Sequence, residues 1–297
     1  MHKATNNNKL DYETISILLD KKISPNKQNY SQKTSLHNVC NHLQLNLKLL
    51  EKMLKFGGDF NKIDKFKMSS LHYLFNNENL SKDMITILPS DYGVSFRNFY
   101  DSSLCLPVYY LINNKNFDFD IFSAINKNFF LDLGEINKKK KVSFLSHLII
   151  SNNFSLDILQ YYFKIVEKKN HFESDSFYKK TPLHFFTEKY FSDEKNFSQI
   201  FFLLLEQKAD LNSFDYNGMT PVCYLFENSY FQDPKNFFLL HKIFDDFTFF
   251  FDWKNKKFLK SIFSRVFHFS NPLLFVFLIL HLHDQNINDF VKKKKIF

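Results

Sequence analysis

The sequence predicts an all-α fold, a solenoid of about seven helix-turn-helix units with short β-hairpin or turn connections. Two observations support this prediction. A tetrapeptide of the type Thr181-Pro182-Leu183-His184 recurs along the chain, and a turn-like element of the type Ala209-Asp210-Leu211-Asn212 recurs in a fixed phase with it. Because stacked-repeat proteins repeat a unit of about 20–50 residues, two signals in one phase indicate a solenoid.

The tetrapeptide marks the expected helix starts. Thr or Ser is a preferred N-cap, and Pro at the next position costs little because its missing N–H would be unpaired there. The first two clear copies start 35 residues apart and the last two 39 apart. The clear copies are Thr34-Ser35-Leu36-His37, Ser69-Ser70-Leu71-His72, Thr181-Pro182-Leu183-His184 and Thr220-Pro221-Val222-Cys223, and the degraded ones are Leu106-Pro107-Val108-Tyr109 and Ser143-Phe144-Leu145-Ser146.

The turn-like element marks the expected helix ends. It reads Gly57-Gly58-Asp59-Phe60-Asn61 and, more weakly, Gly134-Glu135-Ile136-Asn137, and it follows apolar runs such as 47–54. Gly57 and Gly134 suit the left-handed residue that ends a helix. Gly218 suits a turn with positive φ.

At these residues the chain resembles the ankyrin repeat family, whose unit of about 33 residues is a β-turn and two antiparallel helices with a T-P-L-H-x-A signature. The segment 215–221 (DYNGMTP) is similar to the family's D-x-x-G-x-T-P opening. The segment 203–212 (LLLEQKADLN) is similar to its L-L-x-x-G-A-D-x-N close, with Lys208 in the glycine place. The resemblance covers about residues 10–290. It implies structural signature roles for Thr34, Leu36, His37, Leu71, His72, Thr181, Pro182, Leu183, His184, Gly218, Thr220 and Pro221.

The chain departs from the family pattern in two ways. The signature's small Ala is replaced by larger residues, which implies wider helix packing; these are Val39, Leu74, Phe186 and Leu225. The segments 76–81 and 188–196 are interpreted as insertions between the two helices of a unit.

The repeat phase divides the chain into three parts. Residues 1–30 form a partial N-terminal capping unit, 31–290 the repeat array, and 291–297 a basic tail. The expected units are 31–65, 66–101, 102–138, 139–176, 177–215, 216–253 and 254–290.

Composition argues against several function classes. Phe occurs 40 times and Asn is abundant, which we interpret as the mutational background of an A/T-rich genome. The net charge of +8 would suit nucleic acid, but Arg97 and Arg265 are the only arginines, so the forks that read guanine and phosphate are nearly absent. Three cysteines in no disulfide or metal spacing favour an intracellular, cytoplasmic setting, with a nuclear or host-cell location as the alternative.

Metal chemistry is the alternative role for the signature histidines. Units stacked about 8–10 Å apart cannot bring His37, His72 and His184 within about 2.0 Å of one Zn²⁺. His281 and His283 are two residues apart, so on a helix they point to different faces. We expect hydrogen bonds at the helix starts, with no metal and no cofactor.

No catalytic motif occurs in the sequence. The cysteines Cys40, Cys105 and Cys223 fall in the repeat pattern and are expected to be small buried hydrophobes. We therefore expect no enzyme activity.

The resemblance implies a protein-interaction scaffold that binds a partner protein through its turn tips and concave face, and it allows a host-directed effector. The expected contact residues are Lys62, Asp64, Lys65, Phe66, Lys67, Phe214, Asp215, Tyr216 and Asn217. An aromatic patch, 247–253, is a further candidate. The oligomeric state stays open.

A membrane-peripheral protein is the competing interpretation. Residues 272–282 are intensely apolar but, at about eleven residues, fall short of the about twenty that span a bilayer. The lysine runs 138–141 and 292–295 are expected to be a solvated turn and a frayed end, with a nuclear import signal as the alternative for the second.

Overall fold

The computed structural model describes residues 1–6, 11–88, 100–129, 135–137, 141–166, 172–175, 177–189 and 194–227. These residues belong to two compact parts, Met1–His171 and Phe172–Phe297, called here the N-terminal and C-terminal parts, and each is described by itself. The predicted unit 254–290, the basic tail, the aromatic patch 247–253 and the apolar run 272–282 lie outside the described residues.

The described residues are mostly helical, and the only strands among them form a two-stranded antiparallel hairpin. In that hairpin Glu135 pairs with Ser143 and Asn137 with Val142. The elements are α1 (His2–Thr5), α2 (Tyr12–Asp20), α3 (Ser35–Cys40), α4 (Leu47–Lys55), α5 (Ser70–Phe75), α6 (Lys82–Thr86), α7 (Pro107–Ile112), α8 (Phe119–Phe129), β1 (Glu135–Asn137), β2 (Val142–Ser143), α9 (Phe144–Ile150), α10 (Leu156–Ile165), α11 (Pro182–Lys189), α12 (Glu194–Glu206) and α13 (Pro221–Glu227).

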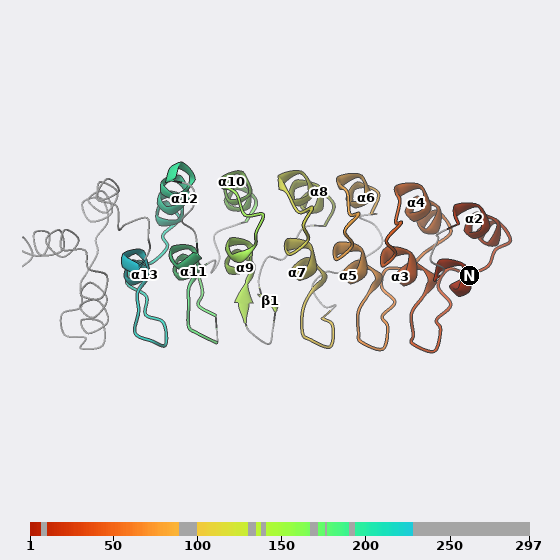
Figure 1. Ribbon diagram of the computed structural model, residues 1–297, viewed down its shortest axis with the longest axis horizontal. Coiled ribbons are helices and arrows are strands. Elements are labelled where there is room, and N and C mark those ends of the chain that lie inside the picture. The colour runs from red at the N-terminus through yellow and green to blue at the C-terminus, as the bar shows by residue number, and fades with distance from the viewer. Residues whose placement is uncertain are drawn as a thin grey trace, which may run out of the picture. The chain divides into compact units, whose positions relative to one another are not determined.

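The helices of the N-terminal part form two layers (Figure 1). The first layer holds α1, α3, α5, α7 and α9, each packed against the next, and the second holds α2, α4, α6, α8 and α10. A loop projects on one side before α3, α5 and α7 (Figure 1). In the C-terminal part α11 packs against α13, and a loop precedes each of them.

The predicted helix starts are confirmed where the residues are described. Thr34 caps α3 and Ser69 caps α5, each in a reciprocal bond with the histidine three residues later. Ser143 caps α9 by accepting from the N–H of Ser146 at 3.1 Å. Leu106 has no side-chain cap, and α7 instead begins with Pro107.

The signature leucines and the large residues in the place of Ala all lie in the core. Leu36, Leu71 and Leu183 are buried, as are Val39, Leu74, Phe186 and Leu225. The ring of Phe186 stacks on Phe197 at 5.0 Å between centroids, so an aromatic pair fills this part of the core. The buried phenylalanines of the described residues therefore serve packing.

Three helices, α2, α4 and α12, end in the same way. Gly57 after α4 has a φ of +79°, and its N–H and that of Gly58 bond back to Leu54 and Met53 at 2.9 Å. Lys22 and Lys208 take the same left-handed conformation after α2 and α12, with φ values of 61° and 69°. Gly57 is thus confirmed as a helix terminator, and Lys208 is in the glycine place, whereas Gly134 lies outside the described residues.

None of the helices in the described stretches combines the length and the apolar character needed to span a bilayer.

Candidate functional site

The turns before α3, α5, α7, α11 and α13 are each built around one acidic or amide side chain. At the turn before α5, Asp64 Oδ1 accepts the N–H groups of Phe66 at 2.8 Å and Met68 at 3.0 Å. Its Oδ2 accepts the hydroxyl of Tyr73, on α5, at 2.7 Å. Because every bond runs from the carboxylate to the same loop or to the helix behind it, Asp64 fixes the tip as a rigid element.

The same device recurs before other helices. Asp101 Oδ2 accepts the hydroxyl of Tyr110 at 2.5 Å, and Asp215 Oδ2 accepts the hydroxyl of Tyr224 at 2.6 Å. Burial raises the pKa of each of these tyrosines and of Tyr73, and the neighbouring aspartate adds to the shift, so all three remain neutral donors.

In the turns before α3, α5, α7, α9, α11 and α13, the residue two positions before the helix cap has a left-handed backbone. Left-handed backbone costs about 1–2 kcal/mol for residues other than Gly, and in the turn of Lys67 the bonds of Phe66 and Met68 to Asp64 hold this conformation. Gly218 has the predicted positive φ of 72°, but it is the only glycine among them. The set is Gln32, Lys67, Leu104, Lys141, Lys179 and Gly218.

Main-chain bonds join neighbouring tips within each part. The N–H of Lys65 donates to the carbonyl of Ser31 at 3.1 Å, and the N–H of Ser102 donates to Phe66 at 2.8 Å. In the C-terminal part the N–H of Tyr216 donates to Tyr178 at 3.0 Å. Adjacent tips are therefore spaced by backbone geometry, independently of their side chains.

The tips present large apolar side chains to solvent. In the N-terminal part Tyr30, Phe66 and Leu104 are exposed, Phe66 to 48%. In the C-terminal part Tyr216 is 66% and Tyr178 53% exposed, and Phe177 lies beside Tyr178. Exposed aromatic groups on rigid turns are typical of interaction surfaces.

The predicted contact residues fall into two groups. Lys62, Lys65, Phe66, Lys67, Tyr216 and Asn217 are exposed, and Phe214 is half-buried. Asp64 and Asp215, however, are only 1% and 4% exposed. Their carboxylates hold the turns, so the prediction that they contact a partner is corrected to a structural role.

Sequence reasoning missed four exposed tip residues, namely Tyr30, Leu104, Phe177 and Tyr178. Their fixed spacing before the recurring tetrapeptide could have identified them as residues of the turn tips. Each lies two to four residues before the helix cap.

The signature histidines join one repeat to the next. Nδ1 of His37 accepts the N–H of Thr34 at 3.1 Å, so Nε2 carries the proton and donates to the carbonyl of Met68 at 3.1 Å. The predicted hydrogen bond at the helix start is confirmed, and the second bond reaches the next turn. The same bridge links Nε2 of His72 to the carbonyl of Cys105 at 3.4 Å and Nε2 of His184 to the carbonyl of Met219 at 3.0 Å.

Among the described residues no group of three or more His, Cys, Asp or Glu is placed to hold a metal ion.

A ladder of asparagines joins the connections between the two layers. Nδ2 of Asn77 donates to the carbonyls of Cys40 at 2.8 Å and His42 at 2.9 Å. Nδ2 of Asn114 donates to Phe75 and Asn77, both at 2.8 Å. Both asparagines are buried, and their amides satisfy the carbonyls of Cys40 and Phe75 at the ends of α3 and α5. They add a second bond to the carbonyls of His42 and Asn77, which also accept a main-chain N–H.

This ladder corrects two sequence interpretations. The segment 76–81 is not an insertion, because the connections 41–46 and 113–118 have the same length. The second correction concerns the abundance of asparagine, which is not mutational background alone, because Asn77 and Asn114 form structural hydrogen bonds. Asn153 continues the ladder by donating to the carbonyl of Asn114 at 2.8 Å.

Comparison with known proteins gives support at the level of the fold. No protein-family model and no curated protein matches the chain. Among solved structures it is similar to the crystal structure of the human ASB11 ankyrin repeat domain, with a TM-score of 0.51 and 15% sequence identity. The match covers 75% of this chain and 90% of that one. The likeness shows a helical repeat fold of the ankyrin type.

Proposed function

We propose that the chain is a non-catalytic protein-interaction module that binds a partner protein through its turn tips. The observation that supports this most directly is the set of exposed apolar side chains on hydrogen-bonded turns, of which Phe66 and Tyr216 are representative. A rigid turn loses little conformational entropy on binding, so an aromatic group on it is an efficient anchor. The fold is of a type that generally serves protein interaction.

Charge around the tips favours an acidic partner. Lys62, Lys65 and Lys67 surround Phe66 and are exposed. The Nζ of Lys65 lies 5.0 Å from the centre of the Phe66 ring. Lysines at the rim of an apolar anchor raise the association rate with an acidic surface more than they raise the affinity.

Nothing in the cysteines indicates a nucleophile. All three are buried and none of them is in a disulfide, and burial raises the pKa of the Cys40 thiol, so it remains protonated and unreactive.

Affinity capture from the native source tests the proposal. The tip variant carries Phe66→Ser, Tyr178→Ser and Tyr216→Ser, and it leaves the buried Asp64 and Asp215 intact so that the turns keep their shape. The matched control carries three exposed apolar changes away from the tips, Tyr12→Ser, Ile17→Ser and Leu43→Ser.

We expect one protein to be retained by the wild type and by the control and lost by the tip variant, with all three chains folded by circular dichroism. If the tip variant captures the same proteins as the wild type, the turn tips are not the binding site.

A further inference from the structure

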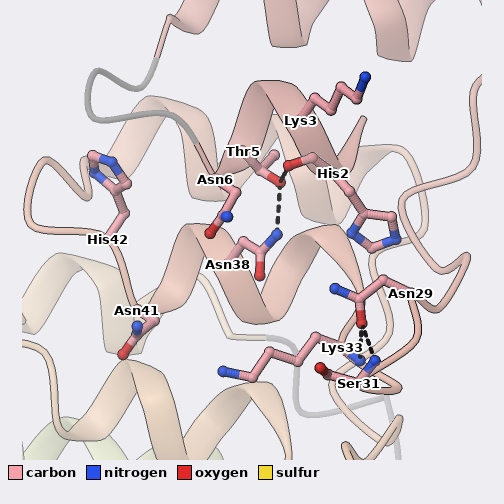
Figure 2. A pocket seen from close by; sticks show the side chains of 10 residues that line it. All are labelled: His2, Lys3, Thr5, Asn6, Asn29, Ser31, Lys33, Asn38, Asn41 and His42. Carbon is pink, nitrogen blue, oxygen red and sulfur yellow. Dashed lines mark hydrogen bonds between the residues drawn. The ribbon is translucent and has the colours of Figure 1, made fainter.

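A polar pocket of about 420 Å³ lies beside the first projecting turn (Figure 2). Its walls come from α1 with the residue that follows it, the turn 29–33, and the end of α3 with the two residues that follow it. In Figure 2 the amide of Asn38 lies between Thr5 and Lys33, and it donates to the hydroxyl of Thr5 at 3.1 Å. The lining residues are His2, Lys3, Thr5, Asn6, Asn29, Ser31, Lys33, Asn38, Asn41 and His42.

The lining is basic and contains no carboxylate. Neither Lys3 nor Lys33 forms an ion pair with a residue in the described part of the chain. The Nζ of Lys33 lies 4.4 Å from the centre of the ring of Tyr73, a residue of α5, so the charge of Lys33 lies over this ring. Asp64, the acidic residue of the next turn along the chain, accepts the N–H of Phe66 in its own turn and the hydroxyl of Tyr73. No residue that lines the pocket therefore offsets the charge of its two lysines.

Hydrogen-bond donors surround this charge. Asn29 uses its Oδ1 to accept the N–H groups of Ser31 at 2.9 Å and Lys33 at 3.0 Å, and its NH₂ group makes no hydrogen bond to a described residue. The amides of Asn6 and Asn41 make no hydrogen bond to any described residue. An amide offers both a donor and an acceptor, which is the pattern that a peptide backbone requires.

We infer that this pocket binds an acidic peptide segment of a partner protein, with the carboxylates near Lys3 and Lys33 and the peptide groups bonded to the asparagines. Lysine binds carboxylate as a point charge, and amides that both donate and accept suit a peptide better than a simple inorganic anion, which mainly accepts. The inference rests on the proposed interaction function, but it concerns a surface that the tip variants leave unchanged.

The test uses the full chain, isotope-labelled for amide NMR, and a peptide of consecutive glutamates flanked by Gly-Ser pairs. A glutamine counterpart and inorganic phosphate at matched ionic strength are the comparison ligands. We expect the glutamate peptide to shift the amide signals of the pocket residues, while the glutamine peptide has little effect.

The double variant Lys3→Gln, Lys33→Gln should weaken peptide binding by about 2- to 25-fold, because each partly screened charge contact contributes about 1.4- to 5-fold. The matched control Lys48→Gln, Lys55→Gln removes two exposed lysines from α4 and the same net charge, and it should bind like the wild type.

Three outcomes would overturn the inference: equal weakening in both double variants, equal binding of the two peptides, or shifts with phosphate but not with the glutamate peptide. Loss of partner capture by the tip variant together with any of these would leave the proposed function standing and remove only the pocket.

Discussion

Nε2 of His37 lies 3.1 Å from the carbonyl oxygen of Met68, so the imidazole that begins one helix also holds the turn of the next repeat. Because Nδ1 is already bonded to the N–H of Thr34, the ring makes both bonds only in one neutral tautomer. Local and inter-repeat structure therefore depend on the same side chain.

Replacing this histidine tests its contribution to stability. His37→Ala removes the bond to Met68 and leaves the N–H of Thr34 unsatisfied in a buried place, whereas the carbonyl of Met68 keeps its bond from the N–H of Asp64 at 2.9 Å. We expect the free energy of unfolding in urea to fall by about 1–3 kcal/mol, as for other buried polar groups that lose a partner. A loss below about 0.5 kcal/mol would show that the bridge contributes little.

The histidines also predict a pH dependence. Burial lowers the pKa of His37 and of His184, although the bonds to Met68 and Met219 partly oppose it. The unfolded chain takes up protons at its ordinary pKa of about 6.5, whereas the folded chain does so only at lower pH. The unfolded state thus binds more protons in this window, and stability falls as the pH drops below about 6.5 toward the lowered pKa values.

Urea unfolding at about pH 7.5 and about pH 5.5 measures this slope. The variant His37→Gln, His184→Gln lacks both titrating groups and should show a smaller loss between the two conditions. An unchanged slope in that variant would assign the pH dependence to other residues.

The asparagine ladder gives a matched pair of substitutions in adjacent positions. Asn77 is buried and donates to two carbonyls, whereas Asn76 is exposed at the end of α5. Asn77→Ala should lower the free energy of unfolding by about 2–3 kcal/mol, and Asn76→Ala by less than about 0.5 kcal/mol. Equal losses would mean that the ladder adds no specific stability.

The helix ends predict a gain in stability. Lys208 is left-handed, with a φ of 69°, in the place where Gly57 ends α4. Lys208→Gly should therefore raise the free energy of unfolding by about 0.5–1 kcal/mol, because glycine has no steric cost there. The reverse change, Gly57→Lys, should lower it by a similar amount, and thermal unfolding of both variants measures the difference.

The sequence predicted the parts of the fold that depend on local rules. The Thr or Ser before Leu36 and Leu71 marked helix starts, because N-capping needs only residues within one turn. Gly57 marked a helix end for the same reason. At Lys208 the family resemblance supplied the position, since lysine by itself does not indicate left-handed backbone.

The parts that sequence reasoning missed depend on contacts between repeats. The amide of Asn77 is bonded to residues 35 and 37 positions earlier in the chain, so no local pattern distinguishes it from Asn76. Asp64 belongs to a turn that was expected to be exposed. Its burial follows from the bond to Tyr73, nine residues later.

Hydrogen exchange of the captured complex tests the central claim most directly. In the partner's presence, we expect slower amide exchange in the segments 62–67 and 214–217, and no change in α2 and α4 of the second layer. Protection confined to the second-layer helices, with the turn segments unchanged, would contradict binding through the turn tips.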